Sequence, residues 1–216
     1  MNNKILLALL ISMTLGCSIS YSQKSKLSYD INKLLHENKL IKITPLQRVA
    51  EITDGSKQGL SLDGILWLKG LDFKTGTIDV DLRGKDIFQQ SFLGIAFHGI
   101  DTAVYDVIYF RPFNFRATDT LRHKHAVQYM SLPGYEWDKL RQEYPLVYEN
   151  EVNPAPQATA WFHTRIVVNV DDIVVYVDHA DKPSLKVKKL NNRQTGLLGL
   201  WSTGLPGDFA NLVITQ

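Results

Sequence analysis

The chain has 216 residues, of which 24 are Lys or Arg and 22 are Asp or Glu, so its formal net charge is only +2. Its lysines show no cluster beyond Lys186, Lys188 and Lys189, which excludes the electrostatic footprint of a protein that binds nucleic acid or anionic lipid. Cys17 is the only cysteine, so no disulfide or thiolate zinc site can form within the chain. Stability must therefore come from a packed core.

The first residues have the pattern of an export signal. Lys4 precedes an apolar run over residues 5–15, and small residues follow. The run is shorter than the roughly 20 residues that a membrane-spanning helix needs, so we expect no transmembrane segment. Thr14-Leu15-Gly16-Cys17 resembles a lipoprotein box, which would end the signal at residue 16 and place a lipid on Cys17. Ser20-Tyr21-Ser22 resembles an ordinary cleavage site, which would end the signal at residue 22.

Either signal predicts an exported protein, located in the periplasm, on the outer membrane as a lipoprotein, or outside the cell. About 190 residues remain after cleavage and fit one domain. Residues 23–45 are expected to form a leader or a short helix that starts at Ser28 or Asp30, because apolar residues recur there at near-helical spacing. Residues 46–216 are predicted to form the domain itself.

Alternation of apolar and polar residues dominates the remaining chain. About ten short segments have the period of two that is typical of strands, and turn residues separate them. This pattern predicts an all-β fold, an antiparallel two-sheet jelly-roll sandwich. The predicted strands are residues 62–69, 76–82, 92–98, 105–110, 126–130, 161–170, 173–178, 184–190, 197–201 and 209–214.

Residues 132–160 form the one long irregular stretch, in which residues 137–144 are expected to make a helical turn. Loops of this length in a compact domain are usually functional or contain short elements of their own.

Residues 105–149 place four arginines among ten tyrosine, phenylalanine and tryptophan residues. Guanidinium groups beside flat aromatic faces suit a hydroxyl-rich ligand with a planar face, such as a sugar. We interpret the stretch as the wall of a binding cleft. The alternative is that these are ordinary strand aromatics and solvated arginines.

Alternation also predicts which side chains share a face. His163 and Arg165 should point to the same side, Arg111 continues the face of Tyr109, and His98 follows Gly94 and Ala96. If these faces adjoin, their side chains line one groove. A shift of one residue in the register of a strand would instead turn its side chains toward the core. The candidate saccharide-binding residues are His98, Tyr109, Arg111, Asn114, Arg122, Gln128, Tyr129, Trp137, Arg141, His163, Arg165 and Trp201.

Several local motifs resemble the concanavalin A-like lectin/glucanase superfamily, and within it bacterial exported domains of the 3-keto-disaccharide hydrolase type. The similarity covers residues 59–215, and its best matches are the segments 76–81, 92–97, 105–111 and 207–212. Ile108 stands where the narrower family has a glutamine. The resemblance implies a jelly roll with a concave sheet that binds saccharide, and hydrolase or lyase chemistry where catalytic groups are present.

The sequence lacks the Glu-x-Asp-x-x-Glu motif of the laminarinase-like members, so a two-carboxylate glycosidase would need a dispersed pair. A keto-glycoside reaction needs only one base and one cation, because the ketone acidifies a neighbouring ring hydrogen. The catalytic candidates are Glu149 and His125, with His163 as a further base and Arg111 or Arg122 as the cation. The alternatives are a structural histidine and an ion pair between Glu149 and a nearby arginine.

No cofactor and no metal-ligand set is predicted, although calcium near Asp208 is an open alternative. The leading hypothesis is an exported carbohydrate-active protein that binds, and as an enzyme would cleave, a glycoside or keto-glycoside in a concave groove. The alternatives are a non-catalytic lectin-like module that binds glycan and an adhesion module that binds protein.

Overall fold

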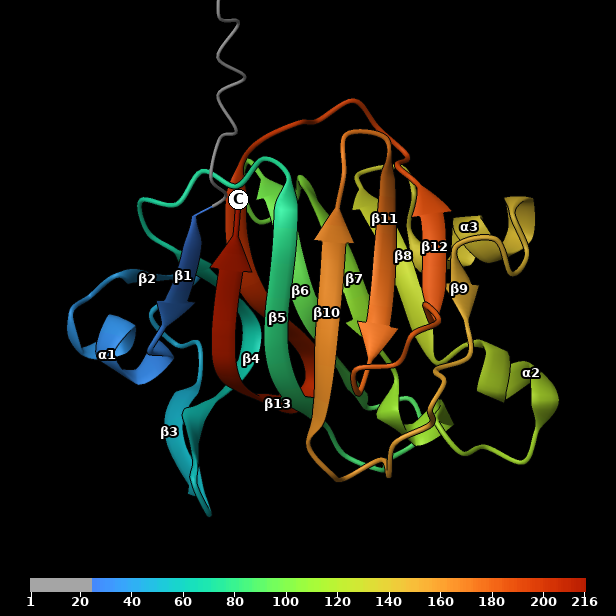
Figure 1. The fold of residues 1–216 in the computed structure, drawn as a ribbon, viewed down its shortest axis with the longest axis horizontal. Coiled ribbons are helices and arrows are strands. Elements are labelled where there is room, and N and C mark those ends of the chain that lie inside the picture. The colour runs from blue at the N-terminus through green and yellow to red at the C-terminus, as the bar shows by residue number, and fades with distance from the viewer. Residues whose placement is uncertain (1–24) are drawn as a thin grey trace, which may run out of the picture.

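The computed structural model describes residues 25–216 and shows an antiparallel β-sandwich with three short α-helices in that part of the chain (Figure 1). The elements are β1 (Lys26–Tyr29), α1 (Ile31–His36), β2 (Leu40–Lys42), β3 (Val49–Asp54), β4 (Lys57–Leu68), β5 (Gly76–Arg83), β6 (Ser91–Gly99), β7 (Tyr105–Phe110), the 3₁₀ helix η1 (Pro112–Asn114), α2 (Thr120–Lys124), β8 (Val127–Leu132), α3 (Trp137–Glu143), β9 (Glu149–Asn150), β10 (Phe162–Val168), β11 (Asp172–Val177), β12 (Leu185–Lys188) and β13 (Leu197–Thr215).

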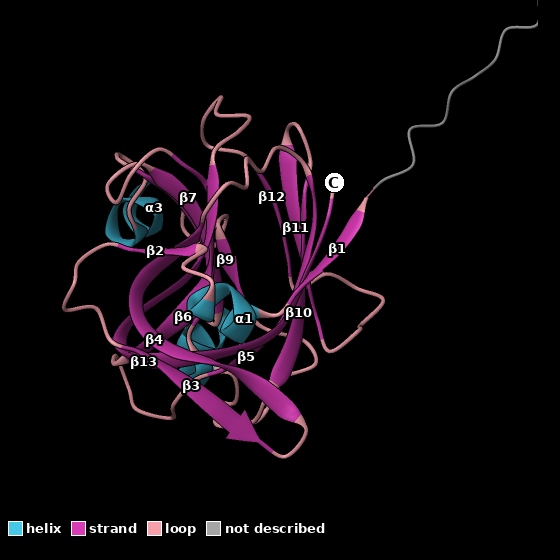
Figure 2. Ribbon diagram, turned by 90° about the vertical axis from the view of Figure 1, so that its left-hand side faces the viewer, coloured by secondary structure: helices cyan, strands magenta, loops and turns pink. Residues whose placement is uncertain are grey.

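Two sheets face each other (Figure 2). The first sheet has the order β9-β8-β7-β6-β13-β4-β2, and the second has the order β12-β11-β10-β5-β13-β4-β3, with β1 added to the end of β13. Every pairing is antiparallel. The all-β sandwich predicted from the alternation is therefore confirmed.

Strands β4 and β13 belong to both sheets because each bends partway along its length. Their pairing is interrupted between Ser202 and Gly207, where the chain passes from one layer to the other. Gly64 and Gly204 lie at this bend with φ of +86° each, a conformation that residues with a Cβ rarely adopt. The two strands predicted at residues 197–201 and 209–214 are thus the halves of one strand.

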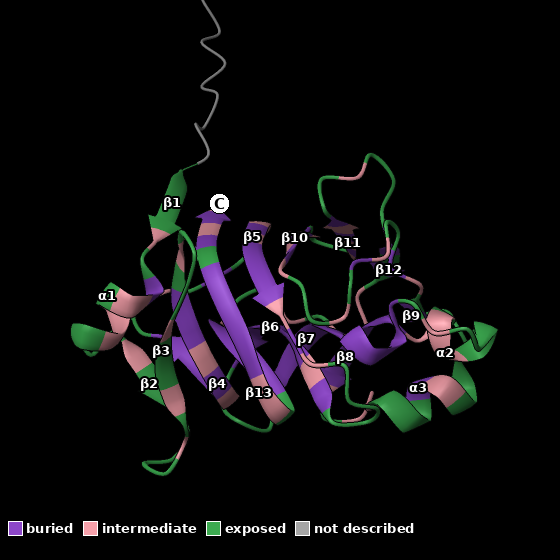
Figure 3. Cartoon of the chain, turned by 90° about the horizontal axis from the view of Figure 1, so that it is seen from below, coloured by how far each residue is buried: buried purple, intermediate pink, exposed green. Residues whose placement is uncertain are grey.

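The main hydrophobic core fills the space between the sheets. Alternation along β10 buries Phe162, Thr164, Ile166 and Val168 and leaves the intervening residues partly or fully exposed. Figure 3 shows that central strands such as β5 are buried, whereas α2, α3 and β3 are largely exposed. A sheet of this kind buries one face and leaves the other free to carry polar groups.

The segment before residue 46 is part of the sandwich. Asp30 caps α1 by accepting a hydrogen bond from the Lys33 amide, which confirms the short helix and selects Asp30 over Ser28 as its start. Strand β1 pairs with β13, and β2 pairs with β4. The predicted export signal and Cys17 lie outside the described residues. In the part of the chain from residue 25 onward, no helix is long and apolar enough to cross a membrane.

The long stretch after β8 contains the expected helical turn as α3, and then β9, which pairs with β8. Figure 2 shows α3 outside the first sheet, on the side away from β10 and β11. This stretch therefore builds a wall over the outer face of the first sheet.

Candidate functional site

A cleft of about 530 Å³ opens on the outer face of the first sheet. Strands β6, β7, β8 and the first half of β13 form its floor, and η1, α2 and α3 form its rim. Aromatic and arginine side chains make up most of the wall. The lining residues are Phe88, Gln89, Phe92, Tyr109, Arg111, Phe113, Asn114, Arg122, His125, Met130, Trp137, Arg141, Trp201 and Thr203.

Two aromatic rings meet over a glycine on the cleft floor. Tyr109 on β7 and Trp201 on β13 both lie opposite Gly94 on the strand between them. Because Gly94 has no side chain, the two rings approach across β6 to a centroid distance of 5.3 Å. Gly94 thus leaves room above the sheet, and the two large rings occupy it.

Arg111 follows β7 and is held rigidly beneath the cleft. Its guanidinium donates to the Tyr109 hydroxyl, to Oε1 of Gln128 and, over 3.0 Å, to the His125 carbonyl. It also lies 4.7 Å from the centroid of the Tyr109 ring, a cation–π distance. Burial lowers the pKa of Arg111 and raises the pKa of Tyr109 to about 12, so Tyr109 stays a neutral hydroxyl at neutral pH.

Glu149 on β9 is the carboxylate behind the cleft, and its side chain is only 2% exposed. Arg141 binds it in a bidentate manner, with Nε 3.0 Å from Oε1 and Nη2 2.9 Å from Oε2. Nη1 of Arg111 lies 3.6 Å from Oε2, and Nδ1 of His125 lies 2.7 Å from it. One buried carboxylate thus holds three nitrogen groups around the site.

His125 lies at the end of α2, with its ring between Glu149 and the cleft. Burial lowers the pKa of His125, and the charges of Arg141 and Arg111 lower it further despite the opposing effect of Glu149. The ring is therefore neutral at neutral pH. A neutral imidazole whose Nδ1 faces a carboxylate can present Nε2 as a proton acceptor.

Helix α3 contributes Trp137 and Arg141, which lie on the same helix face because four residues make about one turn. Trp137 is 50% exposed, and the Arg141 guanidinium lies 5.3 Å from its ring centroid. On the opposite rim, Arg122 lies 4.2 Å from the Phe88 ring centroid and donates to Oδ1 of Asn114 over 3.3 Å. Both rims therefore combine an arginine with an aromatic face.

The structure brings most of the expected residues to one place. Those that line the cleft or lie directly behind it are Tyr109, Arg111, Asn114, Arg122, His125, Gln128, Trp137, Arg141, Glu149 and Trp201. It does not bring His98, Tyr129, His163 or Arg165 there, so the expected grouping is wrong for these four.

His98 turns into the core because β6 contains a bulge. The pairing with β13 shifts between Leu197 and Gly199, and His98 has a φ of +49°. The side chain is fully buried and stacks on Phe73, with Nε2 2.7 Å from the Lys74 carbonyl. The expectation that His98 continues the face of the small residues on β6 fails at this bulge.

Tyr129 also points into the core, because it alternates with Gln128 on β8. Its hydroxyl donates to Oδ1 of Asp106 over 2.9 Å. Asp106, Tyr129 and Asn191 belong to one buried hydrogen-bond network on the side of the sheet away from the cleft.

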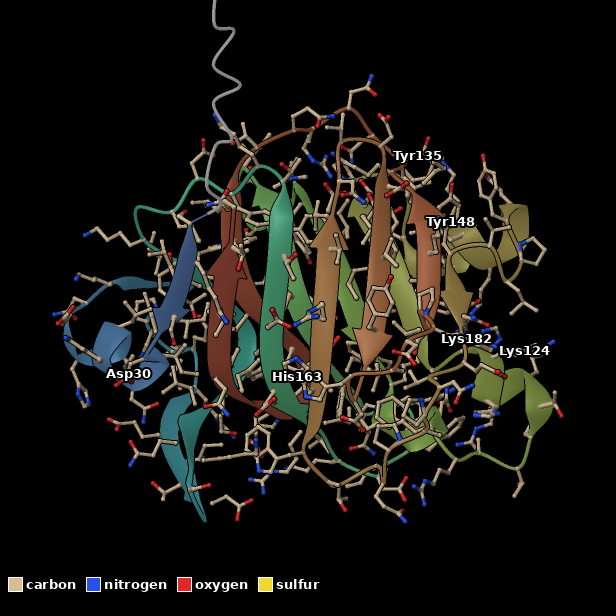
Figure 4. The ribbon with its side chains drawn as sticks, in the orientation of Figure 1. Asp30, Lys124, Tyr135, Tyr148, His163 and Lys182 are labelled. Atoms are coloured by element: carbon tan, nitrogen blue, oxygen red, sulfur yellow. The ribbon has the colours of Figure 1, made fainter. Side chains whose placement is uncertain are left out.

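His163 and Arg165 share a face as predicted, but that face is the outer surface of the second sheet. Nδ1 of His163 lies 2.9 Å from Asp81 and Nε2 lies 3.1 Å from Asp79, while Arg165 donates to Asp79 over 2.8 Å. Lys57 also contacts Asp81. These five side chains are called the outer patch. Figure 4 shows His163 on β10, in the layer nearest the viewer.

Sequence reasoning missed part of the cleft lining. Phe92 was recoverable from alternation, because it shares a face with Gly94 and Ala96 on β6. Met130 was recoverable in the same way, because it shares a face with Gln128 on β8. The other missed residues come from the loop before β6, from η1 or from the bend in β13, where alternation gives no cleft assignment. They are Phe88, Gln89, Phe113 and Thr203.

Asp208 is buried and accepts from Nε of Arg83 over 2.8 Å, with Nζ of Lys85 at 3.5 Å. Arg83 and Lys85 thus form ion pairs with the carboxylate of Asp208, and calcium binding there stays a prediction. Within residues 25–216, no group of three or more His, Cys, Asp or Glu side chains has a geometry that could hold a metal ion.

No protein-family model matches the sequence, and no curated protein is significantly similar to it. The carbohydrate binding module CBM66 from Bacillus subtilis is a structural neighbour with a TM-score of 0.57 and 12% identity, over 82% of this chain and 95% of that one. A protein of unknown function with a galectin-like fold, also from Bacillus subtilis, has a TM-score of 0.52 and 11% identity, over 79% and 87% of the chains.

A third neighbour is the GlcNAcα1-4Gal releasing endo-β-galactosidase from Clostridium perfringens. Its TM-score is 0.52 and its identity 7%, over 92% of this chain and 64% of that one. At these identities the likeness is one of fold alone. The chain therefore has the same β-sandwich fold as a carbohydrate binding module, a galectin-like protein and an endo-β-galactosidase.

Proposed function

We propose that this protein binds a saccharide in the cleft of the first sheet. The observation that carries the proposal is the convergence of three arginines with exposed aromatic faces around one hollow of about 530 Å³. Apolar ring faces can stack on the C–H face of a sugar, and guanidinium groups can donate to its hydroxyls. The names of two neighbours, a carbohydrate binding module and an endo-β-galactosidase, support the same class of ligand.

Trp137→Ala is the clean test of this proposal. Trp137 is half exposed on α3, so its removal takes away a stacking surface without opening the core. We expect a loss of saccharide affinity of about tenfold or more, measured by a glycan array and then by calorimetry on the bound glycan. Tyr176→Ala, which removes an aromatic ring from the outer face of the second sheet, is the matched control and should bind as the parent does.

Arg111→Ala is a poorer test, because Arg111 is almost fully buried and joined to Tyr109, Gln128 and His125. Its loss would disturb the folded state as well as the cleft.

If the unmodified protein binds no glycan but captures a protein through this cleft, the adhesion alternative replaces the proposal.

The pairing of His125 with Glu149 favours a second function, catalysis on a keto-glycoside. In this proposal His125 Nε2 takes the proton from the carbon beside the ketone, and the electron pair moves to the carbonyl oxygen. A cleft arginine would hold the resulting enolate. Arg122 suits this role better than Arg111, whose N–H groups already have protein acceptors. As the enolate returns to the ketone, the glycosidic C–O bond on the carbon next to the deprotonated one breaks, and the departing oxygen takes up a proton.

Turnover of a 3-keto-glycoside, followed by chromatography of the products, tests the catalytic proposal. His125→Gln should abolish turnover and leave saccharide binding largely intact, because the ring is part of the wall and not its main stacking surface. A parent protein that binds saccharides but releases no product from keto or plain glycosides would be a lectin-like module.

For either function we propose that the protein is exported through its N-terminal signal, with or without a lipid on Cys17.

A further inference from the structure

The cleft carries an excess of positive charge. Arg111, Arg122 and Arg141 all line it, and among residues 25–216 no Asp or Glu does so. The carboxylate that approaches it is Glu149, which lies behind the wall and is shared by Arg111 and Arg141. Three guanidinium groups therefore face a hollow that has one recessed counter-charge.

Arg122 has only neutral partners. Its Nε donates to Oδ1 of Asn114, and its Nη2 donates to the Phe113 carbonyl over 3.1 Å. Charged groups in a partly desolvated site are stabilised by an opposite charge far more than by neutral oxygens. An anion in the cleft would supply the counter-charge that Arg122 lacks.

Donors remain free to bind such an anion. Nη1 of Arg141 and Nη1 of Arg122 make no hydrogen bond to any other described residue, although both side chains line the cleft. Each guanidinium also lies over an aromatic ring, Trp137 or Phe88, which holds its plane in place. A fixed guanidinium with a free N–H edge suits a carboxylate or a sulfate.

The outer patch has no cation of this kind. There Asp79 and Asp81 face Lys57, His163 and Arg165, and each of these three cations contacts a carboxylate directly. A guanidinium group without a carboxylate partner, that of Arg122, is thus a feature of the cleft and not of the outer patch.

We propose that the ligand of the cleft is an acidic saccharide, one that carries a carboxylate, as in a uronic acid, or a sulfate ester. The inference rests on the proposed saccharide binding and names the class of sugar. The aromatic faces hold the sugar body, and the free edges of Arg122 and Arg141 hold its negative group.

Calorimetry with matched oligosaccharides tests the inference. One pair compares oligogalacturonate with the corresponding neutral galacto-oligosaccharide, and a second compares a sulfated oligosaccharide with its desulfated form. We expect the acidic member of at least one pair to bind tenfold or more tightly at low salt, with the preference shrinking as NaCl is raised. The pair that shows the preference tells carboxylate from sulfate.

Two substitutions of Arg122 test whether this side chain causes the preference for acidic saccharides. Arg122→Gln should weaken binding of the acidic member far more than binding of the neutral member and so remove most of the acidic preference, and Arg122→Lys should keep part of it because the charge remains. Arg165→Gln makes the same change of charge on the outer patch, where the side chain is 51% exposed, and should leave the preference unaltered.

Equal affinity for the acidic and neutral members of both pairs would overturn the inference and leave saccharide binding intact. An acidic preference that survives in Arg122→Gln and equally in Arg141→Gln would overturn the assignment to these side chains. Absence of binding to every saccharide would instead remove the proposed function, and the inference with it.

Discussion

On the outer face of the first sheet, His125 lies beside one carboxylate and two guanidinium groups, whereas on the outer face of the second sheet His163 lies between two carboxylates. Hydrogen bonds with Asp79 and Asp81 raise the pKa of His163 to about 9, while burial and neighbouring arginines lower the pKa of His125. The two histidines therefore differ in charge at neutral pH, because His163 is protonated and His125 is neutral.

The two faces show how a binding site differs from a solvated polar face. In the outer patch each cation contacts a carboxylate. Burial by itself would raise the pKa of Asp81, but hydrogen bonds from His163 and Lys57 lower it to about 2. In the cleft the charges do not balance, and η1, α2 and α3 enclose the hollow in which they lie. A polar face becomes a binding site where loops wall it and leave groups without partners.

Removing a carboxylate should affect the two regions very differently. Glu149→Gln leaves Arg111 and Arg141 without a counter-charge in a buried setting, so we expect the free energy of unfolding to fall by about 3 kcal/mol. Asp79→Asn, in the more exposed outer patch, should lower it by about 1 kcal/mol, because His163 keeps Asp81 as a partner. Urea denaturation of the two variants measures the difference, and similar losses would contradict the contrast.

A methyl group added at Gly94 on the cleft floor should disturb the packing of the Tyr109 and Trp201 rings. A Cβ on Gly94 would lie 2.0 Å from the Ile108 carbonyl oxygen and 2.7 Å from the Tyr109 Cα, so β7 would have to move. We expect Gly94→Ala to destabilise the fold by about 2 kcal/mol and to weaken saccharide binding. Thr77→Ala, on the outer face of the second sheet, should change stability by less than about 0.5 kcal/mol. Denaturation curves and calorimetry on both proteins would show whether the floor tolerates the methyl group.

The two histidines should give stability opposite dependences on pH. The raised pKa of His163 adds stability below pH 6.5 that is lost as the pH rises to about 9, by roughly 1 to 3 kcal/mol. The lowered pKa of His125 adds stability above its ordinary pKa that is lost as the pH falls below 6.5.

Unfolding free energies measured from pH 5 to pH 10 separate these contributions. His163→Gln should flatten the alkaline side of the profile, and His125→Gln should flatten the acid side. A single variant that flattened both sides would show that the two regions are coupled.

A small effect is also expected from Arg165→Gln. Arg165 is half exposed and pairs with Asp79, so its loss should change the free energy of unfolding by less than about 1 kcal/mol. Saccharide binding should not change, because the residue lies on the sheet opposite the cleft. A clear loss of binding would place a second saccharide site on the outer patch.

Most of the cleft was predictable because it is built from one continuous segment. Residues 105–149 form β7, η1, α2, β8, α3 and the start of β9 in succession, so arginines and aromatics close in sequence remain close in space. Loop residues such as Phe88 were not predictable, since they reach the cleft through the pairing of strands distant in the chain.

The sequence by itself determined the sandwich, most of its strands and the cleft segment, because a period of two forces alternate residues to opposite faces of a sheet. It did not predict the short strands β1, β2, β3 and β9. It placed His163 and Arg165 on one face. Only the tertiary structure decided that this face belongs to the second sheet, and that a bulge turns His98 inward. The physical reason is that alternation fixes the side of a strand, whereas long-range hydrogen bonding chooses its neighbours and interrupts its register.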